Sequence, residues 1–113
     1  MRKRQVRQRI GLGVENDNFL TRNMNDEEED TFCYKLIEEG IFDVAKLKQI
    51  IKYVSIKRNI NKEALKWIID CIDRCYTYHK DDSDLYYIMN YSVDDENMWK
   101  NVWKEKLLRV LKQ

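Results

Sequence analysis

One stretch, residues 61–79 (NKEALKWIIDCIDRCYTYH), constrains the fold of this chain more than any other. At the α-helical period of about 3.6 residues, its apolar side chains fall on one side and most of its charged side chains on the other. Asn61 is a suitable N-cap, because its side-chain oxygen can accept a hydrogen bond from the first turn. We therefore predict a central helix against which the other helices pack. Its apolar side consists of Leu65, Ile68, Ile69, Ile72 and Tyr76.

Residues that break helices are scarce. The chain has 113 residues with no proline, and glycine occurs only at Gly11, Gly13 and Gly40. The tight turns of a multi-stranded β-protein depend on these two residue types, so their scarcity favours helices. With 43% hydrophobic residues, the chain also has enough apolar surface for one folded domain. We predict an all-α fold, a small bundle of about four helices over residues 27–39, 43–58, 62–79 and 93–112, with a short helical segment at 84–90.

Capping residues suggest where these helices begin and end. Asp43 is placed to cap the helix of residues 43–58, and Ser92 to cap the last helix. The first helix would carry the acids of residues 26–30 in its first turn, where the helix dipole favours negative charge, and would end at Gly40.

Connection lengths and apolar spacing add two expectations about packing. The connection between the helices of residues 43–58 and 62–79 is short, and short connections usually join antiparallel neighbours. In the segment 84–90, we expect Leu85, Ile88 and Met89 to point inward.

Residues 1–25 have no sustained apolar period, so we expect a basic, flexible arm ahead of a single helical domain at residues 26–113. The basic residues of the arm are Arg2, Lys3, Arg4, Arg7 and Arg9, with no acid among the first nine residues. Arginine makes paired contacts to phosphate oxygens, so one interpretation of the arm is nucleic-acid binding. A nuclear targeting signal, a solvated tail and an arm folded onto the protein's own acids are alternatives.

A second basic stretch lies on the predicted helix of residues 43–58. Lys46, Lys48 and Lys52 fall in a region that has no acid between Asp43 and Glu63. Together with the arm they would form a phosphate-binding surface. The alternative is an ordinary solvated helix face.

Two groups of residues suggest a protein partner. Phe32 and Tyr34 follow the acids of residues 26–30, and an aromatic anchor beside acidic charge suits a basic partner. In the alternative interpretation, these acids are simply the acidic first turn of a helix. On the last predicted helix, Trp99 and Trp103 lie along one apolar side, and Val102 and Leu108 broaden that side beyond what one packing contact needs. That surplus would bind a partner or a second copy. In the alternative interpretation, the tryptophans simply fill the core.

Cysteine and histidine recur along the central helix. Cys71, Cys75 and His79 are spaced four residues apart, and Cys33 on the first helix would complete a set of four zinc ligands. Structural zinc sites usually take one pair of ligands from a C-x2-C turn, which this chain lacks. We therefore expect no metal, with buried cysteines acting as small apolar side chains.

Catalytic signatures are missing from the sequence. It has one histidine, no phosphate-binding glycine loop, no nucleophile elbow and no H-E-x-x-H, so we predict that the chain is not an enzyme and needs no cofactor. No apolar run approaches the about 18 residues of a membrane span. Three cysteines without a secretory signal favour a reducing compartment, the cytoplasm or nucleus.

The sequence is most typical of a non-catalytic protein–protein interaction module, an adaptor or a small subunit of a larger complex. Its partner would be another protein, including a second copy of itself. The alternative is an RNA- or DNA-binding module that uses the arm and the lysines of residues 43–58. A third hypothesis, a virus-encoded helical antagonist of a host protein, is suggested only by size and composition.

Overall fold

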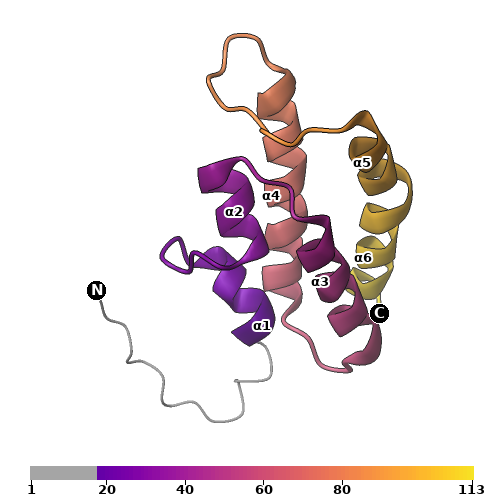
Figure 1. Cartoon of the computed structure of the whole chain (residues 1–113). Coiled ribbons are helices and arrows are strands. Elements are labelled where there is room, and N and C mark those ends of the chain that lie inside the picture. Colours follow the sequence, from indigo (N-terminus) through magenta and orange to yellow (C-terminus); the bar gives the residue numbers. More distant parts are fainter. Residues whose placement is uncertain (1–17) are drawn as a thin grey trace.

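The computed structural model describes residues 18–113, and all of their regular structure is helical (Figure 1). Three of the elements, α5, the π-helical η4 and α6, follow one another without a break and form one long last helix. The predicted all-α bundle of about four helices is confirmed, the four being α2, α3, α4 and this last helix. The elements are α1 (Asn18–Thr21), the 3-10 helix η3 (Arg22–Met24), α2 (Phe32–Glu39), α3 (Val44–Ile56), α4 (Lys62–Lys80), α5 (Val93–Met98), η4 (Trp99–Trp103) and α6 (Lys104–Leu111).

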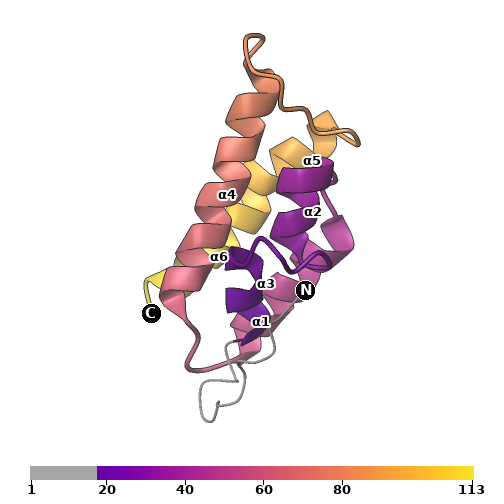
Figure 2. The same ribbon diagram turned by 90° about the vertical axis from the view of Figure 1, so that its left-hand side faces the viewer.

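The central helix α4 is the longest element and runs along the bundle from end to end (Figure 2). The Asn61 side chain caps it by accepting a hydrogen bond from the Ala64 N–H at 3.0 Å. All five residues of its predicted apolar side are buried, and α2 and α6 both pack against it. The prediction from residues 61–79 is therefore correct.

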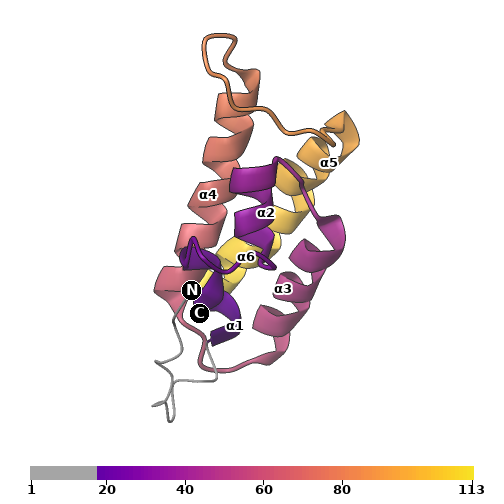
Figure 3. The same ribbon diagram turned by 60° about the vertical axis from the view of Figure 1, so that its left-hand side comes forward.

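Helix α3 begins where predicted, because Asp43 accepts a hydrogen bond from the Lys46 N–H at 3.1 Å. The chain reverses direction between α3 and α4, as the short connection predicts (Figure 3). However, α3 packs chiefly against α6, and α6 in turn packs against α4. The two helices are thus antiparallel without being the close neighbours that we expected.

The last helix begins after Ser92, whose hydroxyl oxygen accepts from the Asp95 N–H at 3.1 Å, as predicted. Its buried side carries Trp99, Trp103, Leu107 and Val110. The indole Nε1 of Trp99 donates to Asp73 Oδ1 on α4 at 2.9 Å, which satisfies the one polar atom of a fully buried side chain.

The first of the four main helices begins later in the chain than predicted. Helix α2 begins only at Phe32, because the Thr31 hydroxyl caps it by accepting from the Tyr34 N–H at 3.1 Å. The preceding acids form turns instead, and Arg22 holds them through Glu28 at 2.7 Å and Asp30 at 2.5 Å. The predicted end is correct, since Gly40 caps α2 in the left-handed conformation.

The prediction of a short helical segment at residues 84–90 is wrong. These residues form part of a loop that projects beyond the end of α4 (Figure 1), with Leu85 fully exposed and Met89 66% exposed. Long-range hydrogen bonds hold the loop instead: the Ile88 N–H donates to His79 Nδ1 at 3.0 Å and the Met89 N–H to the Gly40 carbonyl at 2.7 Å. Only Ile88 of the three residues expected to point inward is buried.

Part of the segment expected to form the arm packs on the bundle. Residues 18–24 form α1 and η3, which contact each other and α4. Leu20 is fully buried, and the Phe19 ring contacts the Tyr53 ring with centroids 4.7 Å apart. The arm residues before position 18 lie outside the described part of the chain.

Candidate functional site

An open groove lies between η3, α2 and the first half of α4. It consists of two adjoining hollows of about 770 Å³ and about 100 Å³, which share Met24, Asn25, Asp26 and Trp67. We call it the acidic groove. Its main lining side chains are Met24, Asp26, Tyr34, Ile37, Glu38, Glu63 and Trp67.

The 3-10 helix η3 forms one wall of the acidic groove, and the buried side chain of Asn23 holds it in place. Its Nδ2 donates to the carbonyls of Phe19 and Leu20 at 3.3 Å, and its Oδ1 accepts from the Cys33 N–H at 3.0 Å. A buried amide with its hydrogen bonds satisfied fixes the backbone around it. Asn23 therefore fastens η3 to the first turn of α2 and sets the position of Met24.

Trp67 forms the floor where the two hollows meet. It is half-buried on α4 and packs against the buried core. Met24 and Ile37 flank it and are about two-fifths exposed, at 41% and 40%. The groove thus presents apolar and aromatic surface that solvent reaches.

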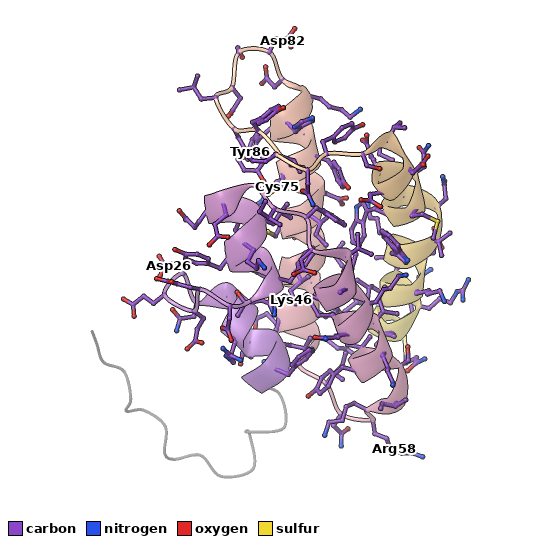
Figure 4. The ribbon with its side chains drawn as sticks, viewed as in Figure 1. Asp26, Lys46, Arg58, Cys75, Asp82 and Tyr86 are labelled. Atoms are coloured by element: carbon purple, nitrogen blue, oxygen red, sulfur yellow. The ribbon has the colours of Figure 1, made fainter. Side chains whose placement is uncertain are left out.

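Acidic side chains surround this apolar floor. Asp26 lies on the turn after η3, Glu38 on α2 and Glu63 on α4, and all three are exposed. Figure 4 shows Asp26 on the side of the molecule formed by α1 and α2. The pKa of Tyr34 is raised, first by burial and then by the negative charge of nearby Glu29, Glu38 and Glu39. The groove therefore favours a positively charged ligand with apolar parts.

The predicted partner-binding residues separate into different environments. Tyr34 lines the acidic groove, whereas Phe32 is buried and packs edge-on against Phe42 at 5.4 Å between centroids. On the last helix, Trp99 and Trp103 are buried in the core, which corrects the expectation that they form a surface for a partner. The tryptophans fill the core because α4 and Phe42 pack on them.

Val102 and Leu108, the other two members of that predicted surface, are half-buried against the core. They leave only small edges of apolar surface on the last helix. Most of the apolar surface that we predicted to be available there is therefore buried by packing within the chain.

The three cysteines lie together in the core, but His79 does not join them. Cys33, Cys71 and Cys75 are buried free thiols, and they lie close enough together that Cys33 and Cys75 affect the pKa of Cys71. The imidazole of His79 instead stacks on Tyr91 with centroids 4.4 Å apart. Within residues 18–113, no group of three or more histidine, cysteine or acidic side chains is arranged to hold a metal ion.

Of the predicted nucleic-acid-binding residues, the structure describes Lys46, Lys48 and Lys52, all on α3. Lys48 and Lys52 are exposed on α3, and Lys46 is half-buried near the Asp43 cap. Arg2, Lys3, Arg4, Arg7 and Arg9 lie outside the described residues. No helix in residues 18–113 has the length and apolar character needed to cross a membrane.

Sequence analysis missed five of the main lining residues of the acidic groove, Met24, Ile37, Glu38, Glu63 and Trp67. Trp67 belongs neither to the apolar side of α4 nor to its charged side, and a large aromatic at such a boundary position was the available signal. Met24 lay in the segment assigned to the arm. Comparison of the chain with models of known protein families, with curated proteins and with solved structures finds no match.

Proposed function

We propose that this protein is a non-catalytic interaction module that holds a basic segment of a partner protein in its acidic groove. The observation that carries the proposal is the exposed apolar floor around Trp67 beneath acids from three separate elements. An adaptor or a small subunit of a larger complex fits this description. Its three cysteines are free thiols, which suits the cytoplasm or nucleus.

The chemistry of the groove specifies what such a segment contains. A lysine or arginine placed over the Trp67 ring gains a cation–π interaction of about 0.5–2 kcal/mol, depending on how far it is desolvated. The rim acids Glu38 and Glu63 accelerate encounter with a basic chain and orient it. Apolar side chains of the partner cover Met24 and Ile37. Tyr34 and Trp67 belong to residue types that are enriched at the energetic centre of interfaces.

Selection of a displayed random peptide library against the purified protein tests this function. We expect the enriched peptides to combine lysine or arginine with leucine, isoleucine or phenylalanine. They should lose most of their binding to the double variant Glu38→Lys, Glu63→Lys, and retain it with Glu105→Lys, a reversal of an exposed acid on α6 outside the groove. Enriched peptides that are acidic, or that bind the double variant equally well, would contradict the proposal.

A second candidate function is RNA or DNA binding, and the side of the molecule formed by α3 and α6 favours it. Lys48 and Lys52 are exposed one turn apart on α3. The neighbouring α6 exposes Lys106 and Arg109, with Lys112 just after it. Affinity for a labelled duplex should then fall linearly with salt on logarithmic axes, and Lys48→Glu with Lys52→Glu should weaken it. Salt-independent or absent binding to duplex and single strands would exclude this candidate.

A further inference from the structure

The two ends of α4 differ in charge and in shape. At its C-terminal end, the chain projects as a loop that we call the acidic tip, residues 81–85, with three aspartates and the fully exposed Leu85. At its N-terminal end lies a hollow of about 250 Å³, the basic hollow. The basic hollow is lined mainly by Lys57, Arg58, Ile60, Lys62 and Val110. Figure 4 shows Asp82 and Arg58 at opposite extremes of the molecule.

The acidic tip is built as a defined structure. Asp81 Oδ1 accepts hydrogen bonds from the Ser83 N–H at 2.9 Å and the Ser83 hydroxyl at 2.7 Å, and Asp84 Oδ1 accepts from the Tyr86 N–H at 2.8 Å. These local bonds hold the loop in a turn. A preorganised loop loses little conformational entropy when it binds. The loop therefore holds Leu85 in a fixed, exposed position, where it can act as an apolar anchor.

The basic hollow complements the tip. Arg58 is exposed and makes no ion pair within residues 18–113, and Lys57 contributes a second cation above the Tyr53 ring. Lys62 Nζ donates to the Gln113 carbonyl, so one of its hydrogen-bond donors is already used. Val110 and the half-buried Ile60 supply an apolar floor. The nearby Glu63 lines the acidic groove and not this hollow.

The helix dipole of α4 strengthens the contrast between its ends. Its negative pole lies at the acidic tip and its positive pole at the basic hollow. Lys80 does not offset the tip, because Glu96 pairs with it at 3.0 Å. With 19 residues, α4 is about 28 Å long. The tip therefore cannot reach the hollow of its own chain, and the two surfaces can meet only between molecules.

We propose that the protein associates with itself head to tail, with the acidic tip of one copy seated in the basic hollow of the next. The aspartates then pair with Lys57 and Arg58, while Leu85 covers Ile60 and Val110. A nucleic acid would neutralise the two cations but would leave Leu85 exposed, which is why a second copy fits better. Contacts between two different surfaces leave a free tip and a free hollow at the ends, so the assembly grows with concentration.

Two matched variants test the arrangement by sedimentation velocity on the full chain. The tip variant is Asp82→Lys with Leu85→Lys, and the hollow variant is Lys57→Glu with Arg58→Glu. Asp82 and Leu85 are exposed and make no hydrogen bond or ion pair within residues 18–113, so their replacement leaves the fold intact, as circular dichroism should confirm.

We expect the wild-type protein to form dimers and longer species as concentration rises, with weaker association at high salt. Each variant alone should associate at least about tenfold more weakly, a loss of about 1.4 kcal/mol. The tip variant keeps an intact hollow and the hollow variant keeps an intact tip. Their equimolar mixture should therefore associate again, whereas Glu105→Lys should assemble like the wild type.

Three outcomes would overturn the proposal. The first is a wild-type protein that stays monomeric at every concentration and salt level. The second is a mixture of the two variants that forms no heterodimer. The third is a labelled duplex that binds the wild type but not the hollow variant, while the protein alone remains monomeric; that result would assign the hollow to nucleic acid.

Discussion

The side-chain amide of Asn90 hydrogen-bonds to both backbone polar groups of Phe42. Its Oδ1 accepts from the Phe42 N–H at 2.8 Å, and its Nδ2 donates to the Phe42 carbonyl at 3.0 Å. Phe42 lies in the short connection between α2 and α3, so this one residue ties the loop after α4 to the other side of the bundle.

Replacement of Asn90 by alanine should therefore loosen the loop. It leaves the Phe42 N–H and carbonyl without their partner, which we expect to cost about 1–3 kcal/mol of unfolding free energy. Hydrogen exchange at the Ile88 and Met89 amides should accelerate, and urea denaturation measures the loss of stability. Asn97→Ala, at an exposed position on α5, is the control and should change neither quantity.

Replacement of Gly40 should destabilise the protein through two separable effects. Its φ is 68°, which most L-residues disfavour, and a Cβ added there would lie 2.5 Å from the Tyr87 carbonyl oxygen. Asparagine tolerates this backbone conformation better than alanine, but it has the same Cβ. We expect Gly40→Asn to lower the melting temperature nearly as much as Gly40→Ala. If Gly40→Asn had the melting temperature of the wild type, the loop would have to move away from the added Cβ, and the close contact with Tyr87 would not affect stability.

Protonation of Glu96 should destabilise the protein in acid. Its burial alone would raise the pKa, but Tyr91, Lys100 and Lys80 hydrogen-bond to the carboxylate and lower its pKa to about 2 from 4.5. The folded protein therefore holds this proton more weakly than the unfolded chain. The stabilisation is complete above the unfolded pKa and is lost as the pH falls from about 4.5 toward 2, at most roughly 3 kcal/mol.

Urea denaturation at several pH values across that range checks the prediction. Glu96→Gln keeps the size of the side chain and removes its titration. The variant should be less stable than the wild type near neutral pH, and the difference should shrink as the pH falls. A constant difference would show that the carboxylate contributes through packing alone.

The buried thiols should resist alkylation in the folded state. The pKa of Cys71 is raised by its hydrogen bond with Cys33, and that of Cys75 by its hydrogen bond with Cys71 and by burial. Because the thiolate is the reactive form, iodoacetamide should modify all three cysteines slowly in buffer and rapidly in urea, as mass spectrometry can follow. Retention of zinc by the purified protein, or protection that depends on added zinc, would instead favour the cysteine–histidine site.

Local signals in the sequence were sufficient for the main helices. Asn61, Asp43 and Ser92 each cap a helix within four residues of their own position, so their effect depends on neighbouring residues alone. The apolar side of α4 was predicted for the same reason, since helical periodicity reports which residues face a core.

The failures have a common physical cause in contacts between distant residues. The segment 84–90 has apolar residues at helical spacing, but the hydrogen bonds between Asn90 and Phe42 connect residues 48 apart and hold it as a loop. Arg22 similarly draws the acids before α2 into turns. Of the acidic groove, only Tyr34 and the acidic stretch that contains Asp26 were predicted, because the groove exists only once η3 has packed beside α4.

The π-helical segment η4 has a consequence for how the last helix can change in length. A π turn contains one residue more than an α turn of nearly the same rise. Loss of Lys100 or Asn101, both exposed, would convert this turn to an ordinary one while Glu96 and Leu107 still face the core. A deletion one turn later would rotate everything beyond it by about 100°. At this position, the loss of a single codon therefore leaves the same side chains of both halves of the helix facing the core.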